Sequence, residues 1–344
     1  MSLATPVLEG NRLALARLLT QIENDTEAGR VALNELYPYT GKAHLVGVTG
    51  APGTGKSSLV NQLARYYRHP PETETALKIG IVAVDPSSPF TGGAILGDRV
   101  RMRDLAGDPG VFIRSMASRG SLGGLATTTA SIVQVMDAAG FEMILIETVG
   151  AGQAEVEIAR LAHTTLVIEA PGLGDDIQAI KAGILEIADI LVINKADRPG
   201  VENAERALRG NLELAHPSKR LINMYSETAH HAAPTVASQH FQGENSELIW
   251  SPPILKTIAT EGVGIAEVGL EILRHYQYLV DSGELKRREK ARLSAELDLL
   301  LQATLVQRWR DSIPDNRYQH VLGQIVERKL SPWQAVQRLL SQST

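Results

Sequence analysis

Short apolar runs alternate with helical stretches through the middle of the chain. Eight runs rich in β-branched residues read as strands, at residues 44–50, 78–85, 111–116, 141–147, 164–170, 189–195, 220–226 and 254–260. Several are continuously apolar rather than alternating, which is typical of parallel strands covered by helices on both faces. This alternation of strand and helix predicts a doubly wound α/β domain with a mostly parallel sheet.

The two ends of the chain carry helical patterns instead. In residues 1–43, Leu15, Leu18, Leu19 and Ile22 recur at spacings of three and four, as on one face of a helix. No strand is expected after residue 265. The C-terminal part therefore reads as a second helical extension.

The C-terminal extension reads as a helical hairpin with a turn near residues 312–315. Ser331 is a predicted N-cap, followed by a proline at the first helical position and a capping-box glutamine at 334. One helix face gathers five leucines, Leu293, Leu297, Leu300, Leu301 and Leu305. An exposed stripe of this kind needs a partner, so we expect a homodimer contact here, although an intramolecular core would explain it too.

Composition narrows the class of protein. The chain has 344 residues, 44% of them hydrophobic and 21% charged, which is ordinary for a globular protein. A net charge of −5 argues against a general nucleic-acid binder, and the lack of cysteine excludes disulfides and thiolate metal sites. No signal peptide and no apolar stretch of about 18 residues is evident, so we expect a cytoplasmic protein with no membrane contact.

A phosphate-binding loop follows the first predicted strand. Residues 50–57, here called the phosphate loop, match G-x-x-x-x-G-K-[ST] and lead into a helical stretch, as the motif requires. Lys56 is expected to reach the β and γ phosphates, and the Ser57 hydroxyl to ligate Mg²⁺. The predicted nucleotide contacts in this segment are Gly50, Ala51, Pro52, Gly53, Thr54, Gly55, Lys56, Ser57 and Ser58.

Acidic residues that end two other strands are candidates for the metal and the hydrolysis chemistry. Glu147 opens the segment E-x-x-G, so we expect it at the magnesium, with the Gly150 N–H on the γ-phosphate. Asp85 begins a loop rich in Gly, Ser and Pro that also carries Asp98, and we expect both acids near the magnesium or the attacking water. The alternatives are a solvated strand end for Glu147 and an ordinary turn for the two aspartates.

A second loop predicts selectivity for guanine. Asn194, Lys195 and Asp197 form an N-K-x-D motif at a strand end. A buried carboxylate at Asp197 accepts two hydrogen bonds from guanine and would lose both with adenine. Lys195 is expected to stack on the base and Asn194 to tie this loop to the phosphate loop. The Ala259 backbone N–H is a candidate donor to the guanine O6.

Taken together, these motifs resemble the MeaB/ArgK-type GTPases. The resemblance runs from about residue 10 to residue 275 and rests on the blocks GVTGAPGTGKSSLVNQL, VDPSSPFTGGAILGDRVRM, SRGSLGGLA, ETVGAGQAEVEIA, IQAIKAGILEIADILVINKAD and PPILKTIATEGVGI. Six residues match functional positions of that family: Lys56, Ser57, Asp85, Asp98, Glu147 and Asp197. Ile258 departs from the serine that many GTPases have before the alanine, so a base contact there rests on the Ala259 backbone.

The resemblance implies a fold, a division of the chain and a partner. The family belongs to the dimerising class of P-loop GTPases. We therefore expect an N-terminal helical extension (residues 1–43), a GTPase domain (44–275) interrupted by a polar insertion (227–249), and a C-terminal helical dimerisation arm (276–344).

The implied function is a chaperone that uses GTP and Mg²⁺ to load and protect an adenosylcobalamin-dependent acyl-CoA mutase, such as methylmalonyl-CoA mutase. The chain has no D-x-H-x-x-G cobalamin signature, so the partner would carry that cofactor. Two alternatives remain open. One is a metallochaperone-type GTPase, and the other is an ATPase or kinase linked to arginine/ornithine transport.

Overall fold

The computed structural model describes residues 2–70, 75–86, 102–105, 107–118, 124–148, 158–172, 185–215 and 250–341. Contacts divide the chain into two compact units, Met1–Lys290 and Ala291–Thr344. The strand expected at 220–226 and the polar insertion at 227–249 lie outside the described residues.

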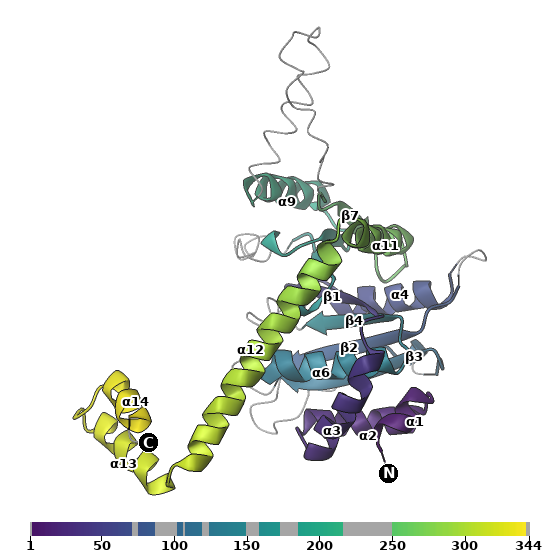
Figure 1. Cartoon of the computed structure of the whole chain (residues 1–344). Coiled ribbons are helices and arrows are strands. Elements are labelled where there is room, and N and C mark those ends of the chain that lie inside the picture. Colours follow the sequence, from purple (N-terminus) through teal and green to yellow (C-terminus); the bar gives the residue numbers. More distant parts are fainter. Residues whose placement is uncertain are drawn as a thin grey trace, which may run out of the picture. The chain divides into compact units, whose positions relative to one another are not determined.

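The first unit is built on a parallel sheet of seven strands (Figure 1). In chain order they are β1 (His44–Gly50), β2 (Ile79–Pro86), β3 (Val111–Ser118), β4 (Met143–Thr148), β5 (Thr164–Glu169), β6 (Ile190–Asn194) and β7 (Ile254–Thr257). Their order in the sheet is β3-β2-β4-β1-β5-β6-β7. β2, β3 and β4 lie on one side of β1, and β5, β6 and β7 lie on the other. Open α/β sheets bind ligands in the crevice at such a change of direction, so the carboxyl ends of β4, β1 and β5 border this crevice.

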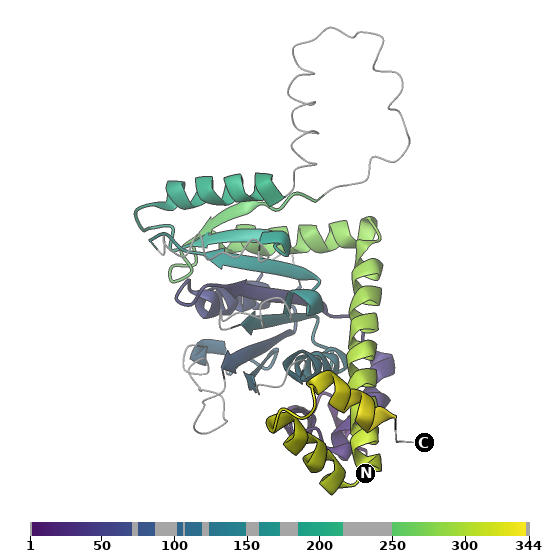
Figure 2. The same cartoon turned by 90° about the vertical axis from the view of Figure 1, so that its left-hand side faces the viewer.

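Helices cover both faces of this sheet, which confirms the predicted doubly wound fold (Figure 2). On one face α4 (Lys56–Arg68) and α11 (Ile265–Asp281) pack on alternate strand residues such as Val46 and Val48. On the other face α6 (Gly124–Ala138) and α9 (Val201–Ala215) cover the intervening residues. The continuously apolar strand sequences follow directly, because both sets of side chains are buried.

The N-terminal helices form an outer layer on α6. They are α1 (Ala4–Leu8), α2 (Arg12–Glu23) and α3 (Glu27–Leu36), followed by the short turn η1 (Tyr37–Tyr39). Their apolar residues join the same core as the sheet.

Polar contacts hold this outer layer to the edge strand β3. Arg12 donates to the carbonyls of Pro109 (2.6 Å) and Val111 (2.7 Å), and Arg114 pairs with Glu23. The N-terminal segment is therefore packed into the first unit rather than separate from it.

The second unit contains the predicted helical hairpin. α12 (Glu284–Ser312) begins in the first unit and runs into the second, where α13 (Asp315–Val326) and α14 (Pro332–Leu340) follow. The turn near residues 312–315 and the capping box at Ser331 are both confirmed. A small core holds the unit together, made of Ile313, Val321, Ala335 and Leu339.

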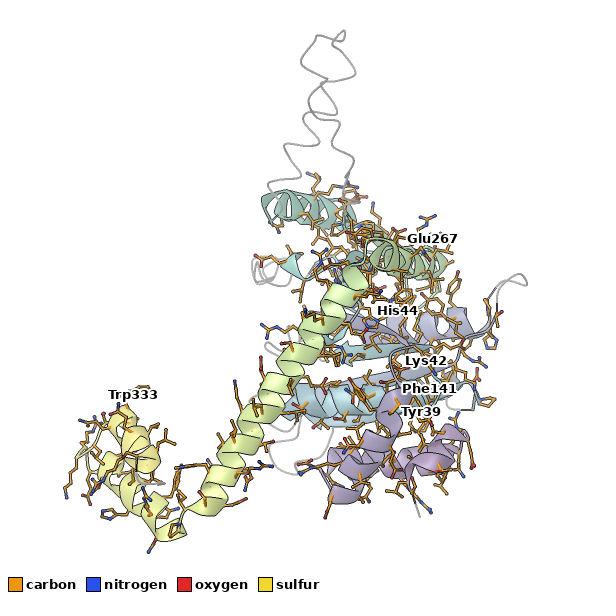
Figure 3. The ribbon with its side chains drawn as sticks, in the orientation of Figure 1. Tyr39, Lys42, His44, Phe141, Glu267 and Trp333 are labelled. Carbon is orange, nitrogen blue, oxygen red and sulfur yellow. The ribbon has the colours of Figure 1, made fainter. Side chains whose placement is uncertain are left out.

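The leucine stripe of α12 is largely uncovered in the single chain. Leu297, Leu301 and Leu305 are 65%, 52% and 55% exposed. Trp333 of α14, labelled in Figure 3, is exposed as well. Among the described residues, no helix combines the length and the apolar character needed to cross a membrane.

Buried histidines gather at the amino edge of the sheet, opposite the crevice. His44, which opens β1 and is labelled in Figure 3, contacts the Thr164 hydroxyl at 2.8 Å. That hydroxyl also contacts His275 Nδ1 at 2.9 Å, and His275 Nε2 lies 3.3 Å from the Asp189 carboxylate. A chain of polar contacts therefore links the starts of β1, β5 and β6 through α11.

Asp189 anchors the first turns of α12 to this edge. Both Arg288 Nη atoms donate to its carboxylate (2.9 and 3.0 Å), and Arg288 also donates to the His163 carbonyl (2.8 Å). Burial opposes the charge on Asp189, but the hydrogen bonds from His275 and Arg288 hold its pKa below the usual value. Asp189 is therefore a charged group inside the fold that depends on its partners.

Replacing Arg288 should destabilise the first unit. Arg288→Ala leaves the Asp189 carboxylate buried with one cationic partner removed, and we expect a loss of about 2 kcal/mol in the free energy of unfolding. This is less than for a fully buried pair because Arg288 is one-third exposed. Urea denaturation measures it, with Arg287→Ala as the control, since Arg287 is exposed and its ion pair is with Glu284, one turn away on the same helix. Equal midpoints for the two variants would contradict the anchoring role.

Stability should fall on mild acidification because of His44. Burial lowers the pKa of His44 well below its usual value, and repulsion from His163 and His275 adds to this. Below about pH 6.5 the unfolded chain binds a proton at this residue while the folded protein does not. As the pH falls below that value, the free energy of unfolding therefore decreases by up to about 1.4 kcal/mol per pH unit.

Urea melts between pH 5 and pH 8 test this expectation. His44→Gln should flatten the slope below pH 6.5, and the exposed His320→Gln should leave it unchanged. A slope that is the same in all three proteins would rule out His44 as its source.

Candidate nucleotide-binding site

The phosphate loop joins the end of β1 to the start of α4 and requires glycine at two positions. Gly50 has φ +139°, and a Cβ there would lie 2.1 Å from the Ile168 carbonyl oxygen of β5. Gly55 has φ +95°, and a Cβ there would lie 2.3 Å from Asn194 Nδ2. Backbone therefore approaches backbone or a fixed side chain at each point, which leaves no room for a larger residue.

Polar groups of the phosphate loop are turned toward one another. Lys56 Nζ donates to the carbonyls of Gly50 (2.8 Å) and Ala51 (3.0 Å), and the Thr54 hydroxyl also donates to Ala51 (2.9 Å). α4 starts after Gly55 without a side-chain cap, so the amides of its first turn, which includes Ser58, suit an anion. Lys56 lies where its ammonium can exchange these carbonyls for phosphate oxygens. Pro52 and Gly53 form the exposed tip of the loop.

Ser57 and Glu147 meet beside the phosphate loop. The Ser57 hydroxyl donates to Glu147 Oε1 at 2.6 Å, and both side chains are buried. The parallel register pairs Val48 of β1 with Glu147 of β4, which brings the carboxylate to the start of α4. A hydroxyl and a carboxylate are the hard oxygen ligands that Mg²⁺ takes beside nucleotide phosphates, so this pair fits a magnesium ion. Among the described residues there is no cluster of three or more His, Cys, Asp or Glu suited to a metal.

The other predicted acids are only partly covered by the structure. Asp85 is the penultimate residue of β2, whose Ala83 pairs with Glu147, so its backbone lies at the same edge of the sheet. Asp98 and Gly150 lie outside the described residues. Their expected contacts with magnesium, water and the γ-phosphate remain predictions.

Asn194 joins three segments around residues 194–197, here called the base-reading loop because of their N-K-x-D motif. Its Nδ2 donates to the Thr54 carbonyl at 2.8 Å, which is the expected tie to the phosphate loop. Its Oδ1 accepts from the Thr257 hydroxyl (3.1 Å) and the Ala259 N–H (3.0 Å). Sequence reasoning missed the contact between Thr257 and Asn194, because nothing in the sequence aligns the ends of β6 and β7. The Ala259 N–H is engaged by Asn194 here, so its contact with guanine O6 stays a prediction for the nucleotide-bound protein.

Lys195 and Asp197 differ from their expected settings. Lys195 adopts a left-handed backbone (φ +60°), and its ammonium donates to the Gly53 carbonyl at 2.5 Å. Its stem therefore spans the gap between the two loops. The Asp197 side chain is exposed, whereas the sequence analysis assumed a buried carboxylate. A base bound against it would supply the missing cover. The backbone of this loop is held by the Ala196 N–H, which donates to the Thr257 carbonyl (3.0 Å).

Comparison with known proteins identifies the family. The family model of the methylmalonyl-CoA mutase-associated GTPase MeaB matches residues 15–313. The chain belongs to the MeaB family. The protein is therefore a member of a GTPase family, and this family implies a guanine nucleotide as the ligand.

Individual relatives agree with this family. The chain is 40% identical to a protein of Pyrococcus abyssi over 97% of its own length and 94% of the relative's. It is 34% identical to the GTPase ArgK of Escherichia coli, over 81% and 76% of the two chains. It is 29% identical to the mitochondrial methylmalonic aciduria type A homolog of Mus musculus, over 98% and 78%. A solved LAO/AO transport system kinase aligns over 98% of this chain and 95% of its own, with TM-score 0.63 and 25% identity.

Substitution of Asp197 should change the preferred purine. Asp197→Asn replaces an acceptor of two guanine hydrogen bonds by an amide, whose N–H suits the extra carbonyl of xanthine. We expect GTP affinity to fall by about 100-fold and XTP affinity to rise, since each charge-assisted bond contributes about 1.5–3 kcal/mol. Competition binding with labelled nucleotide measures both, and the exposed Glu202→Gln is the control. Unchanged GTP affinity in Asp197→Asn would remove the base-reading role.

Proposed function

We propose that this protein is a Mg²⁺-dependent GTPase that serves as a chaperone of an adenosylcobalamin-dependent acyl-CoA mutase. In this role GTP binding and hydrolysis gate the loading of adenosylcobalamin, and protect or reactivate the mutase. The match of residues 15–313 to the MeaB family carries the proposal, because that family is described by its association with methylmalonyl-CoA mutase. The likeness to the mouse methylmalonic aciduria type A homolog supports the same assignment.

Four residues would perform the chemistry: Lys56, Asp85, Asp98 and Glu147. Lys56 would release the carbonyls of Gly50 and Ala51 and donate to the β and γ phosphate oxygens. Ser57 and Glu147 would hold the magnesium ion, Glu147 through a water, and the metal would neutralise charge on the phosphates. Asp85 and Asp98 would lie near the metal or the attacking water.

Hydrolysis by the isolated protein should be slow. In-line attack by water needs a positioned water and neutralised phosphate charge, and closing loops or a partner commonly complete such sites. A glutamine that positions the attacking water, as in small GTPases, would directly follow Gly150, but Gln153 lies three residues beyond it. The mutase would then act as both the client and the activator.

The second unit supports a homodimer. The exposed leucines of α12, Leu297, Leu301 and Leu305, lie on one helix face, where a second copy would bury them. The division into an N-terminal extension, a GTPase domain and a C-terminal arm is part of the proposal, as is a cytoplasmic location. Neither nucleic acid nor membrane is an expected partner.

Two other functions make different predictions. A metallochaperone would bind Ni²⁺ or Zn²⁺ stoichiometrically, which the lack of cysteine disfavours. A transport-linked kinase, the description that the solved LAO/AO structure carries, would use ATP as well as GTP and transfer label to a protein. The Asp197 position argues against ATP as the main nucleotide.

Affinity capture with a purified adenosylcobalamin-dependent methylmalonyl-CoA mutase tests the proposal. We expect nucleotide-dependent capture, and a GTP hydrolysis rate at least about tenfold higher with the mutase, a change of about 1.4 kcal/mol in the barrier. Lys56→Ala should lose tight triphosphate binding and with it the stimulation. The exposed Lys286→Ala is the matched control and should behave as the wild type. No capture in the GDP, GTP-analogue or nucleotide-free state would contradict the chaperone role.

A further inference from the structure

The end of β4 is held from both faces of the sheet. Neighbouring residues of a strand point to opposite faces, so Glu147 and Thr148 project in opposite directions. On the α4 face Glu147 accepts the Ser57 hydroxyl. On the other face the Thr148 hydroxyl donates to the Thr49 hydroxyl at 3.2 Å.

The two threonines lie at a critical place in the chain. Thr49 is the residue before Gly50, where the phosphate loop begins, and Thr148 is the last residue of β4. Both side chains are 1% exposed. The hydroxyl pair therefore joins the base of the phosphate loop to the strand end that carries Glu147.

The two contacts would respond differently to magnesium and nucleotide. In the proposed function the Ser57 hydroxyl turns to the metal, so its direct bond to Glu147 is given up. The Thr49–Thr148 bond involves neither group and can persist. Among the described residues, the Thr49–Thr148 hydrogen bond then still links the ends of β1 and β4, in addition to the backbone hydrogen bonds of the sheet.

We propose that Thr148 is a positioning residue for the magnesium site. Its hydrogen bond to Thr49 fixes the end of β4, and thereby the distance of the Glu147 carboxylate from the phosphate loop, once Ser57 has turned to the metal. The proposal rests on the proposed magnesium role of Ser57 and Glu147.

Loss of one hydroxyl would disturb this geometry for a clear reason. Thr148→Val keeps the shape of the side chain but leaves the Thr49 hydroxyl buried without this partner, which is unfavourable. The strand end can relieve the mismatch by shifting, and Glu147 shifts with it. Replacing both threonines by valine removes the unpaired hydroxyl, so stability recovers although the hydrogen bond between residues 49 and 148 is still missing.

The experiment is a magnesium titration of single-cycle GTP hydrolysis by the full chain. For Thr148→Val we expect the Mg²⁺ concentration at half-maximal rate to rise about tenfold, with GTP affinity at saturating Mg²⁺ changed less than threefold. Thr148→Ser, which keeps the hydroxyl, should restore the wild-type value. Thr129→Val is the matched control, because Thr129 is also buried and its hydroxyl, within the part of the chain that the structure describes, donates to the Met116 sulfur (3.5 Å).

The double variant Thr49→Val/Thr148→Val separates positioning from stability. We expect its melting temperature to return toward the wild type, while its Mg²⁺ requirement stays as high as that of Thr148→Val. A Mg²⁺ requirement that recovers together with the melting temperature would overturn the proposal, and so would an equal shift in Thr129→Val. If the wild type needs Mg²⁺ and Thr148→Val has the same requirement, the positioning role alone fails. A wild-type rate independent of Mg²⁺ would remove the proposed metal role as well.

Discussion

One buried amide, the side chain of Asn194, holds the nucleotide-binding edge of the sheet together. It donates to the phosphate loop at Thr54 and accepts from Thr257 and Ala259 at the end of β7. The groups it joins are far apart in the sequence and have opposite hydrogen-bonding needs, which an amide satisfies and a carboxylate or an amine does not. The spacing between the phosphate-binding loop and the base-reading loop follows from this residue. Gly55 is required for the same reason, since its missing Cβ makes space for the amide.

The carboxyl ends and the amino ends of the strands differ in how their polar groups are paired. At the carboxyl edge, the first turn of α4 has no side-chain cap and suits an anion, and the Ser57–Glu147 pair offers hard oxygens to a cation. At the amino edge, the buried Asp189 carboxylate pairs with Arg288 and lies beside His275. The strands between them are short and packed on both faces, so a close-packed apolar core holds the polar edge in place.

Motif residues were predictable because their chemistry is local. The phosphate loop is contiguous, and its turn conformations need glycine at fixed positions, so residues 50–57 could be recognised from the sequence. The doubly wound sheet could be recognised as well, since continuously apolar strands such as β1 and β6 need cover on both faces. Guanine reading at Asp197 rests on the same local logic. Its burial, however, was assumed and is not observed, because the base itself would supply the cover.

The sequence by itself therefore determined the fold class, the phosphate loop and the residue types available to a nucleotide and a metal. Tertiary structure alone decided which distant groups meet. It brought Ser57 to Glu147, Thr49 to Thr148, Asn194 to Thr257, and Arg288 to Asp189. The physical reason is strand register: which strand lies beside β1, and in what alignment, depends on packing of the whole sheet. Strands such as β1 and β5 are buried on both faces, so they lack the alternation of hydrophobic and polar residues that sets the register of a half-buried strand.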